Sequence, residues 1–139
     1  MTIKVVYLAA RYSRNAEMRQ YRDELAEHGI IVSSRWIDQH GGNVLESFVA
    51  EKLNSEPEYC SKYALVDLDD LAAADTVINF TGLSGGGKGG RHWEMGWAYA
   101  ARKRQFLVGS RENVFHTLPD VIHYNTWDDF VNEKLITNR

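Results

Sequence analysis

The stretch from Thr76 to Ala101 reads TVINFTGLSGGGKGGRHWEMGWAYAA and joins three kinds of local sequence. Its first five residues are mostly apolar and β-branched, which predicts a short buried strand. Seven of the chain's eleven glycines then fall between positions 82 and 96. A helix is predicted after them, with alanines toward its end that favour close packing. A strand that runs through a glycine-rich turn into a helix is the repeating unit of parallel α/β sheets.

Strands and helices alternate along the rest of the chain as well. We expect strands at 3–9, 30–36, 76–80, 105–108 and 121–124, with helices at 16–28, 45–53 (weakly) and 59–74, a short helix at 113–118 and a last helix from Trp127, N-capped by Thr126. This order predicts an α/β fold with a mostly parallel five-stranded sheet and helices on both faces, of flavodoxin-like or Rossmann-like type. At 139 residues we expect a single domain over 1–139.

Composition limits the possible partners. The net charge is −3, with 44% hydrophobic and 25% charged residues, which argues against polymeric nucleic acid because such a partner requires a strongly basic face. The single cysteine, Cys60, excludes an intrachain disulfide and a cysteine-cluster zinc site. The five histidines lack metal-binding spacing, so we expect no metal and no cofactor. We find no signal-like start and no apolar stretch near ~20 residues, so we expect no membrane partner and a cytoplasmic protein.

The glycine-rich loop predicts an anion site. Glycines let backbone amides approach a ligand, and the helix that follows directs free N–H groups and its positive dipole end toward the same place. Lys88, Arg91 and His92 add candidate cations. Residues 82–88 fit the first seven positions of a P-loop, but position 89 is glycine where a hydroxyl should bind Mg²⁺. A flexible surface loop without a ligand is the other alternative, and it leaves the entropic cost of these glycines unexplained.

Glu94 is the candidate nucleophile. We expect it in the first turn of the helix, where the dipole helps to keep a carboxylate ionised. Its bulky neighbours Trp93, Met95 and Trp97 predict a partly apolar cleft around it.

Three aspartates, Asp67, Asp69 and Asp70, lie on the preceding helix. We expect two of them to be solvated, and periodicity does not indicate which is the third. Tyr12 and Trp36 could stack on a base, although an aromatic residue beside a strand is more often part of the core.

Three segments resemble the nucleoside 2-deoxyribosyltransferase family, including its branch of 2′-deoxynucleoside 5′-monophosphate N-hydrolases. Val6 to Ala10 (VYLAA) is similar to the family's opening strand, Y-[LF]-[AC]-G, which leads into a substrate loop. Asp67 to Asp75 (DLDDLAAAD) is similar to the element D-[LI]-x-x-[IL]-x-x-[AN]-D, whose first aspartate faces the active site. Gly90 to Ala98 (GRHWEMGWA) is similar to G-x-G-x-E-[LI]-G-x-A, whose glutamate is the nucleophile.

The resemblance implies a nucleoside deoxyribosyltransferase-like fold and cleavage of an N-glycosidic bond in a small-molecule nucleoside or nucleotide. It implies that the catalytic residues are Glu94, Asp67 and Tyr7, with Asp67 hydrogen-bonded through Tyr7. The implied substrate-binding residues are Ala10, Arg11, Tyr12, Ser13, Gly87, Lys88, Gly90, Arg91, His92 and His116. The resemblance also implies a homo-oligomer, a dimer or higher, in which His116 reaches the site of a neighbouring subunit.

Departures from the family pattern indicate a differently shaped pocket. Ala10 stands where the family has glycine, and His92 replaces a small residue. Transferases of free nucleosides commonly carry an acid six positions before the nucleophile, where this chain has Lys88. A cation there favours a 5′-monophosphate. The base, the sugar and the acceptor, water or a second base, stay open. A nucleotide-binding or sensing module without turnover and an NAD glycohydrolase are the alternative functions.

Overall fold

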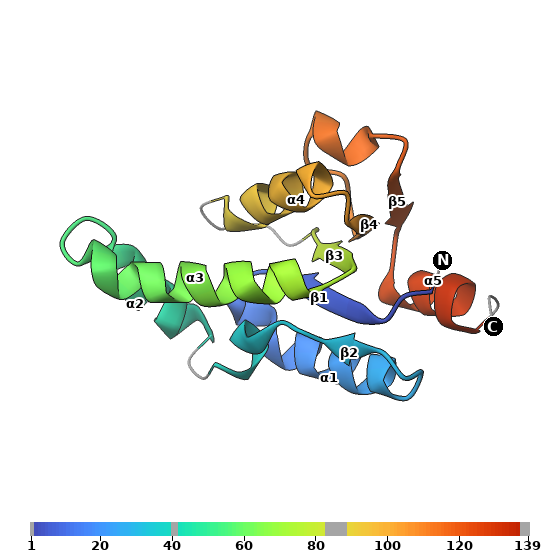
Figure 1. Cartoon of the computed structure of the whole chain (residues 1–139), viewed down its shortest axis with the longest axis horizontal. Helices are drawn as coiled ribbons and strands as arrows, with labels where there is room; N and C mark the ends of the chain where they lie inside the picture. The colour runs from blue at the N-terminus through green and yellow to red at the C-terminus, as the bar shows by residue number, and fades with distance from the viewer. Residues whose placement is uncertain (1, 40–41, 83–88, 137–139) are drawn as a thin grey trace.

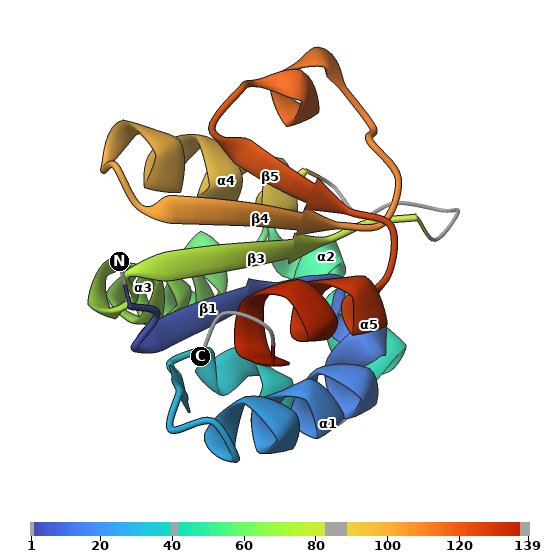
Figure 2. The ribbon, with the colours of Figure 1, turned by 90° about the vertical axis from the view of Figure 1, so that its right-hand side faces the viewer.

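The computed structural model describes residues 2–39, 42–82 and 89–136. A five-stranded sheet runs through it in the order β2-β1-β3-β4-β5, and every neighbouring pair is parallel. Figure 2 shows β1, β3, β4 and β5 side by side with their arrowheads pointing the same way. The strands are β1 (Val5–Ala9), β2 (Ile31–Val32), β3 (Thr76–Phe80), β4 (Arg104–Val108) and β5 (Val121–Tyr124). The predicted five-stranded α/β fold is confirmed, and the sheet is wholly parallel.

Helices cover both faces of the sheet (Figure 1). One face carries the first and last helices, and the other face carries the third and fourth. The helices are α1 (Asn15–Ala26), α2 (Gly42–Lys52), α3 (Pro57–Ala73), α4 (Gly90–Ala100) and α5 (Trp127–Phe130), and shorter helical segments are η1 (Tyr12–Arg14), η2 (Arg35–Asp38), η3 (Val114–Thr117) and η4 (Val131–Ile136). Among the described helices, none is both long and apolar enough to span a membrane.

Alternate residues of the central strands build the two layers of the core. Phe80 on β3 stacks with Tyr21 of α1, and Tyr21 stacks in turn on Trp127 of α5. On the opposite face, the buried Met95 of α4 packs against Leu107 of β4. This alternation is the period of two expected of strands covered on both faces. Because Met95 anchors α4 to the sheet, the direction of its neighbour Glu94 is fixed.

The strand order places a ligand site between β1 and β3. From β1 the chain moves outward to β2, then returns to the other side of β1 and continues through β3, β4 and β5. In doubly wound sheets of this order, ligands bind beyond the carboxyl ends of the strands where the direction reverses. The predicted substrate loop after Ala9 and the start of α4 both lie at this edge.

One predicted strand is mostly wrong. The stretch 30–36 contains only the two-residue β2 and the start of η2. After β2, hydrogen bonds to other elements replace strand pairing: the Ser34 hydroxyl accepts from Leu8 N–H at 2.6 Å, and the Trp36 indole donates to the Leu8 carbonyl at 2.8 Å. These partners lie 26 and 28 residues away in sequence, so local periodicity does not reveal them.

Candidate active site

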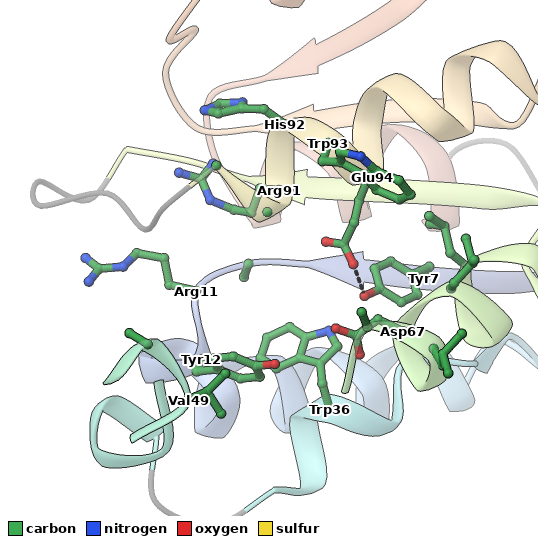
Figure 3. Close-up of a pocket in the computed structure, with 18 of the residues that line it drawn as sticks. Tyr7, Arg11, Tyr12, Trp36, Val49, Asp67, Arg91, His92, Trp93 and Glu94 are labelled. Atoms are coloured by element: carbon green, nitrogen blue, oxygen red, sulfur yellow. Dashed lines mark hydrogen bonds between the residues drawn. The ribbon is translucent and has the colours of Figure 1, made fainter. Parts of the chain in front are cut away.

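A cavity of about 740 Å³ opens at the carboxyl edge of the sheet, at the β1–β3 reversal. This volume lies within the range of roughly 300–1,000 Å³ typical of small-molecule sites. Residues from β1 and the turn after it form one wall, the start of α4 forms another, and α2 and α3 close the far side (Figure 3). The described lining residues are Tyr7, Ala10, Arg11, Tyr12, Trp36, Val49, Ala50, Leu53, Ala64, Leu65, Asp67, Leu68, Leu71, Gly89, Gly90, Arg91, His92, Trp93, Glu94 and Glu112.

The three predicted catalytic side chains meet in this cavity. The Tyr7 hydroxyl donates a short hydrogen bond to Oε2 of Glu94. Figure 3 shows Glu94 descending from α4 toward this hydroxyl, with the Asp67 carboxyl of α3 near Tyr7. The charges of Glu94 and Asp67 both raise the pKa of Tyr7, and the charge of Asp67 also raises the pKa of Glu94. Three elements far apart in sequence therefore place two carboxyl groups and a phenol around one space.

Burial changes the acidity of both carboxyl groups. Desolvation raises the pKa of Glu94 to about 7, helped by Asp67 and opposed by the Tyr7 hydrogen bond and by Arg91. Desolvation also raises the pKa of Asp67 to about 7, with Asp70 adding to the rise and Arg35 opposing it. The pKa of Tyr7 is raised well above its usual range, first by desolvation and then by Glu94. At neutral pH the pair can therefore hold one negative charge and one proton.

The structure corrects two expectations about Glu94. The helix begins at Gly90, so Glu94 lies in its second turn, where the dipole acts more weakly. Burial makes the carboxyl less acidic, and Tyr7, followed by Arg91, stabilises its charge. Because a hydroxyl has only one proton and Tyr7 gives it to Glu94, the expected hydrogen bond between Asp67 and Tyr7 requires Asp67 as the donor. Of its bulky neighbours, Trp93 lines the cavity, whereas Met95 faces the sheet and Trp97 packs against the core.

The opposite end of the cavity is cationic. Arg11, from the turn after β1, and Arg91, from α4, extend toward the same end, away from Tyr7 (Figure 3). Arg91 forms an ion pair with Glu112 at 3.0 Å. Gly89 precedes α4 with φ of 95°, and within the described residues no side chain caps this helix start. Its first N–H groups are thus available to an anion.

The remaining walls are aromatic and apolar. Tyr12 and Trp36 meet edge to face at a centroid distance of 5.7 Å and form one side of the cavity. Trp36 is both a core residue and a cavity residue, since it is buried at 3% exposure and still lines the space. Leu53, in the turn after α2, and Leu65 of α3 are exposed large apolar side chains that reach the same cavity. A flat, partly apolar group such as a base suits these walls.

Most of the predicted binding residues lie at the cavity, and two do not. Ala10, Arg11, Tyr12, Gly90, Arg91 and His92 line it. Ser13 is absent from the described lining. His116 is only 1% exposed, and its Nδ1 accepts a hydrogen bond from Glu112 N–H at 2.9 Å. This burial disagrees with direct contact between His116 and a neighbouring subunit. Gly87 and Lys88 lie outside the described residues.

Sequence reasoning missed several lining residues. Glu112 reaches the site through its pair with Arg91, 21 positions earlier. The apolar residues of α2 and α3 come to the cavity only because the two helices pack together beyond the sheet edge. Gly89 belongs to the glycine-rich loop, and its position beside the helix start is a signal that could have identified it.

Comparisons with known proteins agree with this architecture. No protein-family model matches the chain, and no curated protein matches it. Among solved structures, the chain is similar to the CMP N-glycosidase BcmB of Clostridium botulinum, with a TM-score of 0.55 and 25% sequence identity. The match covers 93% of this chain and 96% of that one. The chain therefore shares its fold with that CMP N-glycosidase over nearly its full length.

Proposed function

We propose that this protein is an enzyme that cleaves the N-glycosidic bond of a nucleoside or deoxynucleoside 5′-monophosphate. The observation that carries the proposal is the pair of half-buried carboxyl groups, Glu94 and Asp67, that face one cavity with Tyr7 hydrogen-bonded to Glu94. The similarity to a CMP N-glycosidase supports a nucleotide as the substrate class.

Glu94 is the nucleophile in this proposal. Bond cleavage builds positive charge on the anomeric carbon and negative charge on the departing base. The ionised Glu94, whose charge the Tyr7 hydroxyl stabilises, attacks the anomeric carbon and forms a glycosyl ester. The bond between that carbon and the base nitrogen breaks, and its electron pair leaves with the base. Water or a second base then displaces Glu94 and completes hydrolysis or transfer.

Asp67 is the acid. With a pKa raised to about 7, it still carries a proton in a large fraction of molecules at neutral pH. It donates this proton to the base as the glycosidic bond breaks, so that the leaving group departs neutral. The two carboxyl groups thereby divide the roles of nucleophile and acid between them.

The cationic end of the cavity suits a 5′-phosphate. Arg11, Arg91 and the N–H groups at the start of α4 lie at the end away from Tyr7. Guanidinium groups and helix N-termini both bind phosphate oxygens well. Lys88 is expected to add to this site.

We further expect a homo-oligomer in which a neighbouring chain contributes to the site. The segment around η3 supports this, because Val114 and Phe115 are large apolar side chains that are 74% and 65% exposed. Sedimentation analysis checks the assembly: a species of twice the chain mass or more agrees with it, and a monomer contradicts it.

The test is a base-release assay over a panel of nucleosides, their 5′-monophosphates and NAD, with chromatography of the free bases. We expect release from a monophosphate, and a loss of at least about 10³-fold in Glu94→Ala because the nucleophile is gone. A competing free base added to the reaction separates transfer from hydrolysis. Binding without release of any base would contradict an enzyme, and release of nicotinamide alone would indicate an NAD glycohydrolase.

A further inference from the structure

Asp70 is a buried acid close to the site that the proposed chemistry does not use. It is 5% exposed and lies three residues after Asp67 on α3. Residues three apart on a helix are surface neighbours, with Cβ atoms about 5–6 Å apart. Asp69, between them, is exposed. Two of the three aspartates are therefore withdrawn from solvent, where the sequence suggested one.

Hydrogen bonds fix the position of the Asp70 carboxyl group. Its Oδ2 accepts from the backbone N–H of Arg35 at 2.9 Å, and its Oδ1 accepts from Arg35 Nε at 2.8 Å. The Ser33 hydroxyl donates to the Asp70 carbonyl at 2.7 Å. Both carboxyl oxygens thus accept N–H bonds, one of them from the guanidinium with which Asp70 forms an ion pair.

We propose that Asp70 is a positioning residue whose negative charge, clamped by Arg35, adds to the effect of desolvation in keeping the neighbouring Asp67 protonated as the acid of the reaction. The inference rests on the proposed function, because it assigns a purpose to the proton on Asp67. A second carboxylate one helical turn away disfavours ionisation of the first. Arg35 sets the strength of this effect: its side chain is 62% exposed and partly compensates the charge of Asp70.

The charged and titratable groups around Asp67 come from four elements. Tyr7 of β1 and Glu94 of α4 face it across the cavity, and Asp67 raises the pKa of both. Asp70 of α3 raises its pKa and Arg35 of η2 lowers it. Glu94 and Tyr7 belong to the reacting trio, so Asp70 and Arg35 are the pair through which the acidity of Asp67 can be changed without altering the residues that we expect to touch substrate.

The test uses four variants of the full chain: Asp70→Asn, Asp70→Glu, Arg35→Gln and Asp69→Asn. Asparagine keeps a carbonyl oxygen for the Arg35 N–H and removes the charge. Carbon-13 NMR follows the titration of the Asp67 carboxyl, and the pH dependence of kcat/KM for base release follows its alkaline limb. Asp69→Asn is the matched control, because it removes an exposed charge from the adjacent position.

The expected shifts have opposite signs. Asp70→Asn moves the Asp67 midpoint and the alkaline limb to lower pH by about half a unit to one unit, and Arg35→Gln moves both to higher pH. Because Asp70→Glu retains the charge, its Asp67 midpoint stays closer to that of the unmodified chain than the midpoint of Asp70→Asn does. Asp69→Asn leaves the Asp67 midpoint unchanged. A merely structural role predicts lost stability without opposite shifts.

Equal midpoints in Asp70→Asn and the unmodified chain, or shifts of the same sign in Asp70→Asn and Arg35→Gln, would overturn the proposal. If the unmodified chain releases no base, the proposed function fails, while the NMR midpoints still decide whether Asp70 controls Asp67. If Asp70→Asn does not fold, Asp70→Ser removes the same charge and is expected to give the same shift to lower pH, and an unchanged midpoint in that variant overturns the proposal.

Discussion

At the scale of single residues, the site depends on two carboxyl groups that have been moved away from their ordinary acidity. Glu94 and Asp67 both reach a pKa of about 7, chiefly through loss of water. The hydrogen bond from Tyr7, assisted by the charge of Arg91, favours the negative charge on Glu94. The assignment of nucleophile and acid therefore depends largely on one phenol.

Tyr7→Phe tests this dependence. Removal of the hydroxyl takes away a bond that lowers the pKa of Glu94, so this pKa rises further. We expect the acid limb of the kcat/KM profile to move up by about one pH unit, the size expected from a hydrogen bond to a charged group. Activity then falls more at pH 6 than at pH 8. An acid limb that stays in place would show that Tyr7 does not control Glu94.

At the scale of elements, α3 carries a buried acid at a cost to stability. Asp67 titrates near 3.8 in an ordinary setting and at about 7 in the fold. Between these pH values the folded chain binds more protons than the unfolded chain, so the free energy of unfolding falls as pH rises through this window. A carboxyl group that can exchange a proton near neutral pH therefore lowers the free energy of unfolding at that pH.

Asp67→Asn removes that cost. We expect the variant to be more stable than the unmodified chain at pH 8, by roughly 1 to 3 kcal/mol, and close to it at about pH 3, where Asp67 is mostly protonated in both states. Denaturant unfolding at the two pH values measures the difference. The same stability change at both pH values would contradict the buried-acid explanation. Base release should be strongly reduced, since the acid is lost.

The start of α4 supplies a matched pair of glycines. Gly89 has φ of 95°, whereas Gly90 is the first helical residue, and among the described residues a Cβ at either position meets no atom within 4 Å. Gly89→Ala should therefore destabilise by about 1 kcal/mol through backbone strain alone. Gly90→Ala should stabilise by up to about 1 kcal/mol. Thermal unfolding of both variants checks the signs, and two shifts in the same direction would contradict the helix start described here.

At the scale of the whole molecule, the sequence predicts the layout better than the site. Local patterns correctly placed the strand Thr76–Phe80, the edge strand Val121–Tyr124 and the cap at Thr126, whose side chain accepts a hydrogen bond from Asp129 N–H. These features depend on residues a few positions apart. The resemblance to a known family then selected three side chains that the fold brings to one cavity.

What the sequence could not predict depends on partners far along the chain. The burial of Asp70 results from its bonds to Arg35, 35 positions away, and the strand predicted at 30–36 gives way to bonds with β1. The acidity of Glu94 depends on Tyr7, 87 positions away. Such contacts exist only once the sheet has formed.

The central claim is that Glu94 forms a covalent bond to the sugar. The most direct measurement incubates the protein with a nucleoside 5′-monophosphate that carries fluorine at the 2′ position, which slows breakdown of a glycosyl ester by destabilising the positive charge that builds on the sugar. Peptide mass mapping then locates the adduct. We predict a glycosyl group on Glu94 with one equivalent of base released, whereas an adduct on Asp67, or a full equivalent of base without any adduct, would contradict the account.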